Sequence, residues 1–280
     1  MIFSLLLWFH TIAAPVPDTL HAAANTPTQT REIRTPIRKT SVRNFAATQT
    51  QLPWNGHFSA KNFSANPNDR LELFEIRKNL RTVFLALPKT HTANLQDLEI
   101  RNEKNVSRGL GNGRKIILNT DSIDDADELI SVFVHELGHA VDLGVLKSGG
   151  GKHSKFYDNG WPVFENDPSV KFYEISWATA KTRKRGSERT DFVSGYAMYD
   201  CFEDFAETYN FYRMHGEKFR KAKKSSAPLR AKYNFMKTVV FDGVEFQTEK
   251  SGEKFVHGII FDTTLLSIDD LENFEILARR

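Results

Sequence analysis

Residues 126–141 read ADELISVFVHELGHAV, and this stretch decides the expected fold. Its apolar residues recur every three or four positions, which predicts an amphipathic helix with one buried face. Ser122, followed three residues later by Asp125, predicts a capping box at the start of this helix, and Gly144 predicts its C-cap. The chain should therefore carry a strong, largely buried helix near its centre.

The pattern His-Glu-Leu-Gly-His occupies residues 135–139 of this helix. Side chains four residues apart share a helical face, so both imidazoles can reach one cation at about 2.0–2.1 Å. Zinc suits this arrangement because it lowers the pKa of a bound water to about 7 and polarises a carbonyl. The pattern predicts His135 and His139 as zinc ligands and Glu136 as the catalytic base. The competing interpretation is two histidines that only pack on the helix.

A catalytic zinc site needs a third protein ligand and an open coordination position. The metzincin class would place a glycine three residues and a third histidine six residues beyond His139. Those positions hold Asp142 and Val145, which excludes that class. The third ligand must therefore come from elsewhere in the chain.

A second strong helix is predicted from Asp200, its expected N-cap, to about His215. It carries Glu203 and Glu207, which lie four residues apart and therefore on one helical face. Such a pair fits a metal ligand and a second carboxylate that accepts the N–H of a liganding histidine. A solvated helix face is the alternative interpretation of the same pair.

Residues 193–207, VSGYAMYDCFEDFAE, resemble the second motif of the gluzincin zinc metallopeptidases related to the catalytic domain of anthrax lethal factor. That family has a Tyr-Ala pair and then Glu-Phe-Phe-Ala-Glu, with the tyrosine seven residues before the liganding glutamate. Tyr196 lies seven residues before Glu203, and residues 135–139 match the first motif without gaps. The resemblance implies that Glu203 is the third zinc ligand, Glu207 the supporting carboxylate and Tyr196 the donor to the oxyanion.

The resemblance covers roughly residues 95–215, with two departures. Asp204 stands where the family has Phe, at a helix position that we expect to be exposed. His139 and Glu203 are 64 positions apart, well beyond the spacing in thermolysin-like enzymes, so a large insertion must lie over or beside the cleft. Either the aromatic residues of this insertion shape substrate pockets, or the insertion is a small packed subdomain.

The remaining pattern predicts an α+β fold, and the resemblance implies a zincin-like metallopeptidase fold: a small mixed sheet, the HExxH active-site helix and a second, glutamate-bearing helix. Besides the two site helices, we expect a helix from Asp69 to just before Pro88, strands at 95–101 and 115–119, a turn at 109–113, an irregular stretch at 145–190, a helical segment at 217–238, and short strands at 239–246 and 255–262.

In zincins the substrate backbone pairs with an edge strand above the active-site helix. Residues 115–119 are the strand expected to do so, and a purely structural edge strand is the alternative.

The N-terminal residues indicate export. Residues 1–24 contain an apolar run followed by small residues, which predicts a signal peptide too short to span a membrane. Residues 25–51 are rich in Thr, Gln and Pro and predict a flexible linker or pro-segment, and residues 52–280 should form the metallopeptidase domain. We therefore expect a secreted or otherwise extracytoplasmic protein without stable membrane association after cleavage. The alternatives are a buried N-terminal segment or a misassigned start codon.

The composition is that of a globular protein. The 280 residues are 40% hydrophobic, and 38 basic against 35 acidic residues give a net charge of +3, which excludes wholesale disorder and offers no argument for a nucleic-acid partner. The single cysteine excludes an intramolecular disulfide. The sequence thus predicts a monomeric zinc endopeptidase that binds one Zn²⁺, acts on a peptide or protein through a metal-activated water and has no nucleic-acid partner. The alternative is a zincin-fold binding or adhesion module that retains zinc with little turnover.

Overall fold

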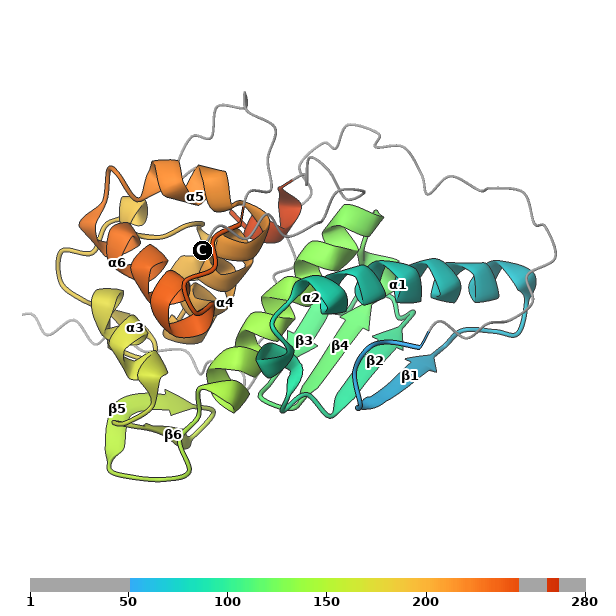
Figure 1. Cartoon of the computed structure of the whole chain (residues 1–280), viewed down its shortest axis with the longest axis horizontal. Coiled ribbons are helices and arrows are strands. Elements are labelled where there is room, and N and C mark those ends of the chain that lie inside the picture. Colours follow the sequence, from blue (N-terminus) through green and yellow to red (C-terminus); the bar gives the residue numbers. More distant parts are fainter. Residues whose placement is uncertain (1–50, 247–260, 267–280) are drawn as a thin grey trace, which may run out of the picture.

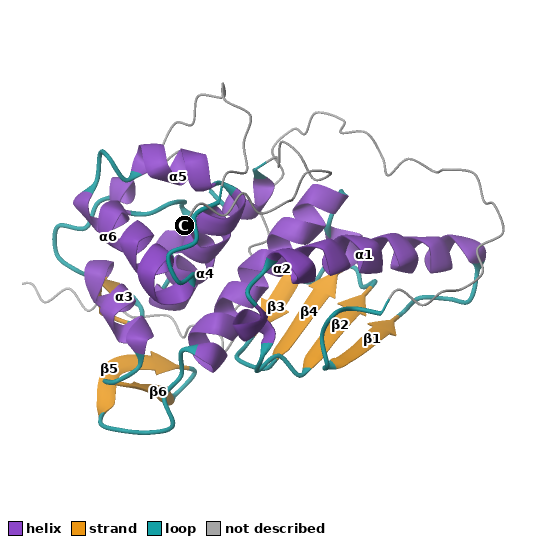
Figure 2. Ribbon diagram, in the orientation of Figure 1, coloured by secondary structure: helices purple, strands orange, loops and turns teal. Residues whose placement is uncertain are grey.

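The computed structural model describes residues 51–246 and 261–266, so residues 1–50, with the expected signal peptide and nearly all of the linker, lie outside the described residues, as do 247–260. Figures 1 and 2 show a sheet with helix α1 across one face, a group of shorter helices beside it, and helix α2 between the two. The expected α+β class, with a small mixed sheet, is confirmed.

The sheet contains four strands in the spatial order β1 (His57–Lys61), β2 (Asp97–Arg101), β4 (Lys115–Asn119) and β3 (Gly109–Gly111). The first three are parallel, and β3 pairs antiparallel with β4. The expectation that residues 115–119 form the edge strand is therefore wrong, because β4 is paired on both sides. Among the described residues the two edge strands are β1 and β3, and β3 is the one beside β4. The turn expected at 109–113 lies at 112–114, between β3 and β4, because residues 109–111 are part of β3. The side-chain oxygen of Asn112 holds this turn by accepting the backbone N–H of Arg114 and Lys115 at 2.9 Å each.

Helix α1 (Pro67–Ala86) begins after Asn66 and ends before Pro88, close to the predicted bounds. Helix α2 (Ala126–Ala140) begins after Asp125, whose side chain accepts the backbone N–H of Glu128 at 2.9 Å. Asp125 is thus the N-cap itself, and the predicted capping box at Ser122 is wrong.

Gly144 does not cap α2. It lies within a π-helical turn, Val141–Val145, that prolongs the helix. A Cβ on Gly144 would lie 2.3 Å from the backbone oxygen of Gly113. The glycine is needed there because the β3–β4 turn approaches the end of the helix so closely.

Residues 145–190 are more regular than expected. They form β5 (His153–Asp158), β6 (Trp161–Phe164), α3 (Pro168–Ser176), β7 (Trp177–Thr179) and β8 (Thr182–Arg183). The β5–β6 hairpin turns at Asn159 and Gly160, both with positive φ (47° and 86°), as a two-residue turn of this type requires. This Asn-Gly pair is a local hairpin signal that the sequence interpretation missed.

The second site helix, α4 (Cys201–Met214), begins after Asp200 as predicted, and the Asp200 side chain accepts the backbone N–H of Glu203 at 2.9 Å. The segment expected at 217–238 is divided into α5 (Gly216–Ala222) and α6 (Ala227–Phe235), because Ser226 provides a new N-cap. The strand expected at 239–246 is not formed: residues 236–240 make a π-helical turn. Of the strand expected at 255–262, residues 255–260 lie outside the described part of the chain.

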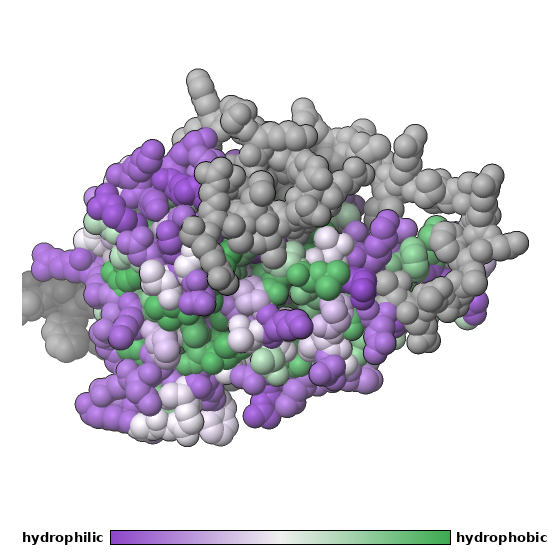
Figure 3. Space-filling model, viewed as in Figure 1, coloured by the Kyte–Doolittle hydropathy of each residue, from purple (hydrophilic) through white to green (hydrophobic). Residues whose placement is uncertain are grey.

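The hydrophobic core begins between the sheet and helices α1 and α2 and continues through the helical half around α4. Leu98 and Ile116 on the sheet and Leu80 and Val83 on α1 are fully buried. The face in Figure 3 is hydrophilic along its left and lower margins, with hydrophobic residues gathered towards the centre. Among the described residues, none of the helices is both long enough and apolar enough to span a membrane.

His91 joins the two halves of the molecule, since it follows α1 and contacts the helical half. Its Nδ1 lies 2.7 Å from the Tyr209 hydroxyl and its Nε2 2.7 Å from the carbonyl oxygen of Val240. Nε2 must carry the proton, because a carbonyl only accepts, and Nδ1 then accepts from Tyr209. Burial lowers the pKa of His91 from 6.5 to about 4.

We expect His91 to make the folded protein sensitive to acid. Between pH 6.5 and 4 the unfolded chain binds a proton at this position and the folded chain does not, so stability falls as the pH falls. The shift corresponds to about 3 kcal/mol when fully developed. Urea unfolding of wild type and His91→Gln at several pH values across this window measures the effect. The variant should show the smaller loss, and equal losses in the two proteins would contradict the prediction.

Candidate metal centre

Helices α2 and α4 pack closely enough to bring their polar residues together. Gly138 on α2 faces Ala206 on α4, and a Cβ on Gly138 would lie 2.9 Å from the Ala206 Cα. Because glycine and alanine stand at the contact, the two backbones approach without a side chain between them. The glycine inside the His-Glu-Leu-Gly-His pattern therefore has a packing role, which is to let the histidines of α2 reach the glutamates of α4.

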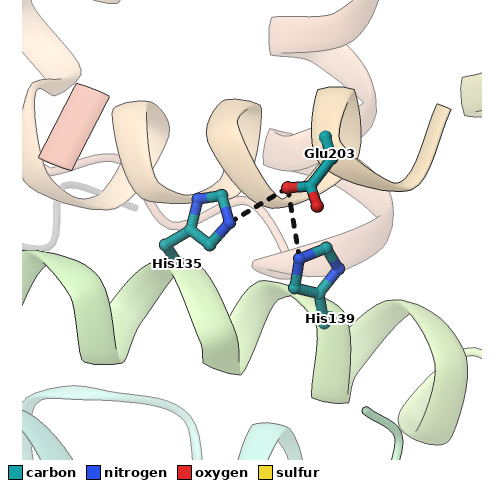
Figure 4. Close-up of side chains that lie close together, drawn as sticks. All are labelled: His135, His139 and Glu203. Atoms are coloured by element: carbon teal, nitrogen blue, oxygen red, sulfur yellow. Dashed lines mark ion pairs between the residues drawn. The ribbon is translucent and has the colours of Figure 1, made fainter. Parts of the chain in front are cut away.

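Three predicted ligands converge at this crossing. His135 and His139 project from α2 towards Glu203 on α4, as Figure 4 shows. The Nε2 atoms of His135 and His139 lie 3.2 and 3.4 Å from the same Glu203 oxygen, Oε2. All three side chains are about 1% exposed. The structure thus contains a buried His-His-Glu group that could hold a metal ion.

The spacing of these atoms fits a small cation. In a tetrahedral site with metal–ligand distances of about 2.0–2.1 Å, neighbouring ligand atoms lie about 3.3 Å apart. The two measured separations, 3.2 and 3.4 Å, bracket that value. Two imidazoles and one carboxylate also form a donor set that leaves one tetrahedral position for another molecule. The residues present therefore fit a metal centre with an open position.

We expect Glu203→Ala to weaken metal binding more strongly than Glu207→Ala. Loss of a direct ligand should lower the affinity by more than about 100-fold, whereas loss of a partner outside the coordination shell typically lowers it about 10–100-fold. Competition with a chromogenic chelator measures both values on proteins whose folding is checked by circular dichroism. The reverse order would identify Glu207 as the ligand.

Glu207 holds His135 in a defined orientation. Its Oε1 accepts the Nδ1–H of His135 at 2.9 Å, which leaves Nε2 facing Glu203. Burial opposes protonation of His135, but hydrogen bonds with Glu203 and Glu207 raise its pKa well above the ordinary value. A bound cation would take the place of that proton on Nε2.

The Glu207 carboxylate has further donors that sequence reasoning missed. Its Oε2 accepts from the Ser194 hydroxyl at 2.5 Å and from the backbone N–H of Thr263 at 2.8 Å, and its Oε1 accepts from the Thr263 hydroxyl at 2.9 Å. Burial and the nearby Asp262 raise the pKa of Glu207, whereas the bonds from His135 and Ser194 lower it. No spacing rule connects positions 194 and 263 with Glu207, so the sequence offers no signal for either residue.

Glu136 belongs to α2, and its carboxylate lies against the edge strand β3. A Cβ on Gly109 would lie 2.3 Å from Glu136 Oε1, and one on Gly111 would lie 2.6 Å from Oε2. Only glycine leaves room for the carboxylate at these two positions. The edge strand is therefore next to the predicted base, which is where the sequence interpretation had expected residues 115–119.

Tyr196 packs against the candidate ligand His135. It lies in a 3₁₀ turn, Tyr196–Met198, just before α4, and its ring stacks on that of His135 at a centroid distance of 6.0 Å. Burial, together with the negative charges of Glu203 and Glu136, raises its pKa. The phenol therefore stays protonated near neutral pH and can act as a hydrogen-bond donor.

A cavity of about 700 Å³ opens where the insertion meets the end of the edge strand. Its walls include Asn112 and Arg114 from the β3–β4 turn, Asp142 from the turn after α2, and Trp161 and Tyr173 from the insertion. Trp161 is 73% exposed, whereas Tyr173 is fully buried and donates its hydroxyl to Asp142 at 2.6 Å. The insertion is therefore not a separate subdomain, because its buried aromatic residues belong to the common core, and part of it lines this cavity.

Asp204 is not exposed, contrary to expectation. It is fully buried on α4 and its carboxylate contacts Lys232 of α6 at 2.7 Å and the indole N–H of Trp177 at 2.9 Å. The position therefore faces the core beneath the insertion, and a charge is tolerated there because a buried cation pairs with it.

Comparison of the chain with models of known protein families, with curated proteins and with solved structures finds no match.

Proposed function

We propose that this protein is a zinc-dependent endopeptidase of the gluzincin type with a zincin-like fold. The observation that carries the proposal is the His-His-Glu group with two further residues beside it: Tyr196, whose ring stacks on His135, and Glu136, whose charge acts on both His135 and Tyr196. A site that only bound metal would need neither. The donor set of two imidazoles and one carboxylate is typical of catalytic zinc, and the resemblance to the lethal-factor-related gluzincins supports the same assignment.

Each residue has a defined task in peptide hydrolysis. When bound, the cation supplies Lewis acidity that polarises the scissile carbonyl and acidifies a water molecule. Glu136 accepts the proton of the attacking water and delivers it to the leaving amine. Tyr196 donates a hydrogen bond to the oxyanion that develops on the carbonyl oxygen. Glu207 keeps the Nε2 atom of His135 directed at Glu203.

The edge strand supplies a binding place for a peptide backbone. Among the residues that the structure describes, β3 pairs only with β4, so its other side can receive an extended peptide as an added strand. Such a peptide would pass Glu136 and, a few residues further along, the cavity bordered by Asn112 and Trp161. Residues on one side of the scissile bond would then occupy that cavity.

A peptide-library digest joined to metal analysis tests the proposal. We expect about one zinc per chain, cleavage of library peptides by the purified protein, loss of cleavage after chelation and its return when zinc is added. Zinc binding without any cleavage would contradict the endopeptidase function and support the binding module instead. Mass spectrometry of the products would also show which residues flank the cleaved bond.

We expect Tyr196→Phe to lower kcat with little change in KM. The substitution removes a hydroxyl that acts on the oxyanion only in the transition state, and loss of one such donor typically lowers kcat about 10²–10³-fold. Steady-state kinetics on a peptide from the library measures both constants. Tyr199→Phe is the matched control, because Tyr199 is a neighbouring tyrosine that is 58% exposed, stacks on Tyr196 and is not one of the three candidate ligands. A change confined to KM would assign Tyr196 to substrate binding.

A further inference from the structure

Residues 261–266, here called the C-terminal clip, lie against the metal centre although they are more than fifty positions beyond Glu207 in the chain. Thr263 is fully buried and gives two hydrogen bonds to the Glu207 carboxylate, one from its backbone N–H at 2.8 Å and one from its hydroxyl at 2.9 Å. The clip therefore supplies two of the four donors on this carboxylate, and His135 and Ser194 supply the other two.

The clip is also tied to the edge strand and to α2 through a buried ion cluster. Asp262 pairs with Arg108, the residue that precedes β3, and Arg108 pairs with Glu128 in the first turn of α2 at 2.7 Å. The second oxygen of Asp262 accepts from the backbone N–H and hydroxyl of Thr264 at 2.8 and 2.6 Å, which fixes the turn that presents Thr263. All four side chains are buried.

A third contact joins the clip to the residue that stands over the ligands. The backbone N–H of Tyr196 donates to the carbonyl oxygen of Phe261 at 2.6 Å, and the two rings lie 6.1 Å apart. The clip thus touches Glu207, the start of the edge strand and the Tyr196 turn, so it contacts three parts of the proposed site without contributing a ligand.

We propose that the C-terminal clip completes the metal centre, and that metal binding and clip docking stabilise each other. The inference rests on the proposed metal site. Without the clip, the buried Glu207 would lose half of its donors and would hold the Nδ1–H of His135 less firmly, so Nε2 would be less well directed at the metal. Coupling between two equilibria is reciprocal, so a bound metal must favour the docked clip by the same factor. Thr263 is a positioning residue in this scheme.

Conservative variants of Thr263 separate positioning from general packing. Thr263→Val keeps the shape and the backbone N–H and removes the hydroxyl, which donates to Glu207 and accepts from the Asn210 amide at 2.9 Å each. Thr263→Ser restores the hydroxyl. We expect the valine variant of the full chain to bind Zn²⁺ more weakly than wild type in chelator competition, by less than the about 10–100-fold loss expected when the carboxylate beside the ligand is removed altogether, and the serine variant to recover most of that loss. Thr208→Val is the control, since Thr208 is equally buried on α4 but bonds to Asp204 instead.

Amide hydrogen exchange tests the reciprocal effect. Addition of Zn²⁺ to the metal-free protein should slow exchange in residues 261–266 of wild type, and more so than in Thr263→Val. Equal zinc affinity in wild type and Thr263→Val would overturn the inference, as would an unchanged exchange rate in the clip. Zinc binding with clip protection but without peptide cleavage would support the inference and refute the endopeptidase function, so the two failures are distinguishable.

Discussion

Glu136→Gln is expected to abolish peptide hydrolysis while the protein keeps its metal. The amide has the shape of the carboxylate but cannot accept the proton of the attacking water, and general base catalysis typically contributes about 10²–10⁴-fold to the rate. Glu136 is not part of the His135, His139 and Glu203 group, so its substitution should leave the ligand atoms in place. Steady-state cleavage of a library peptide and zinc analysis of the same preparation provide the two measurements.

The control for this experiment must change a glutamate without touching the site. Glu165→Gln serves, because Glu165 lies in the insertion and pairs at the surface with Lys152 at 2.8 Å. It should leave both cleavage and zinc content unchanged. If Glu136→Gln retained full activity, Glu136 would not be the base. Loss of zinc in that variant would instead indicate that Glu136 contributes to metal binding.

The candidate ligand residues could be placed on their helices from the sequence because helical spacing is local information, whereas the choice of Glu203 over Glu207 came from the family resemblance. His135 and His139 share a helical face by their spacing alone, as do Glu203 and Glu207, and Asp200 marks the start of the second helix. The structure places both pairs at one crossing, as the sequence interpretation required. Helical periodicity and capping depend on neighbours within one or two turns, which a single sequence displays directly.

The edge strand and the clip could not be predicted because they depend on long-range contacts. β3 is three residues long and contains two glycines, so its composition indicates a turn, and only pairing with β4 makes it a strand. Thr263 reaches Glu207 across 56 positions of sequence. Neither contact leaves a periodic pattern, and both are visible only once the tertiary structure is known.

Asp204 shows a different reason for error. A charged residue on an amphipathic helix is usually solvated, so exposure was the natural expectation. The carboxylate is instead enclosed by the insertion and by α6, with its cationic partner 28 positions later in the chain. Lys232 would itself be assigned to a solvated face by its sequence context. Two residues that each favour water are buried together because they satisfy one another.

Removing either partner of this pair should strongly destabilise the protein. Lys232 Nζ contacts both oxygens of Asp204, at 2.7 and 2.9 Å, and also donates to the carbonyl oxygen of Asp191 at 2.9 Å. Lys232→Met leaves the Asp204 carboxylate buried without its cation, and Asp204→Leu leaves the ammonium without its anion. Loss of one partner from a buried pair typically lowers the free energy of unfolding by about 3–5 kcal/mol. Urea unfolding measures it, with Lys155→Met as the control, because the Lys155–Glu174 pair is half exposed.

The double variant Asp204→Leu with Lys232→Met separates two contributions to the loss of stability. One is the loss of the ion pair, and the other is the cost of leaving a single buried charge without its partner. Replacing both partners with apolar side chains removes the buried charge, so much of the loss in the single variants should be recovered. Recovery should be incomplete, because the indole N–H of Trp177 and the carbonyl of Asp191 would each lose a partner, and an unsatisfied buried group costs about 1–3 kcal/mol. A double variant as unstable as the sum of the two single variants would show that the pair is not coupled, and would place the cause in the packing around α6.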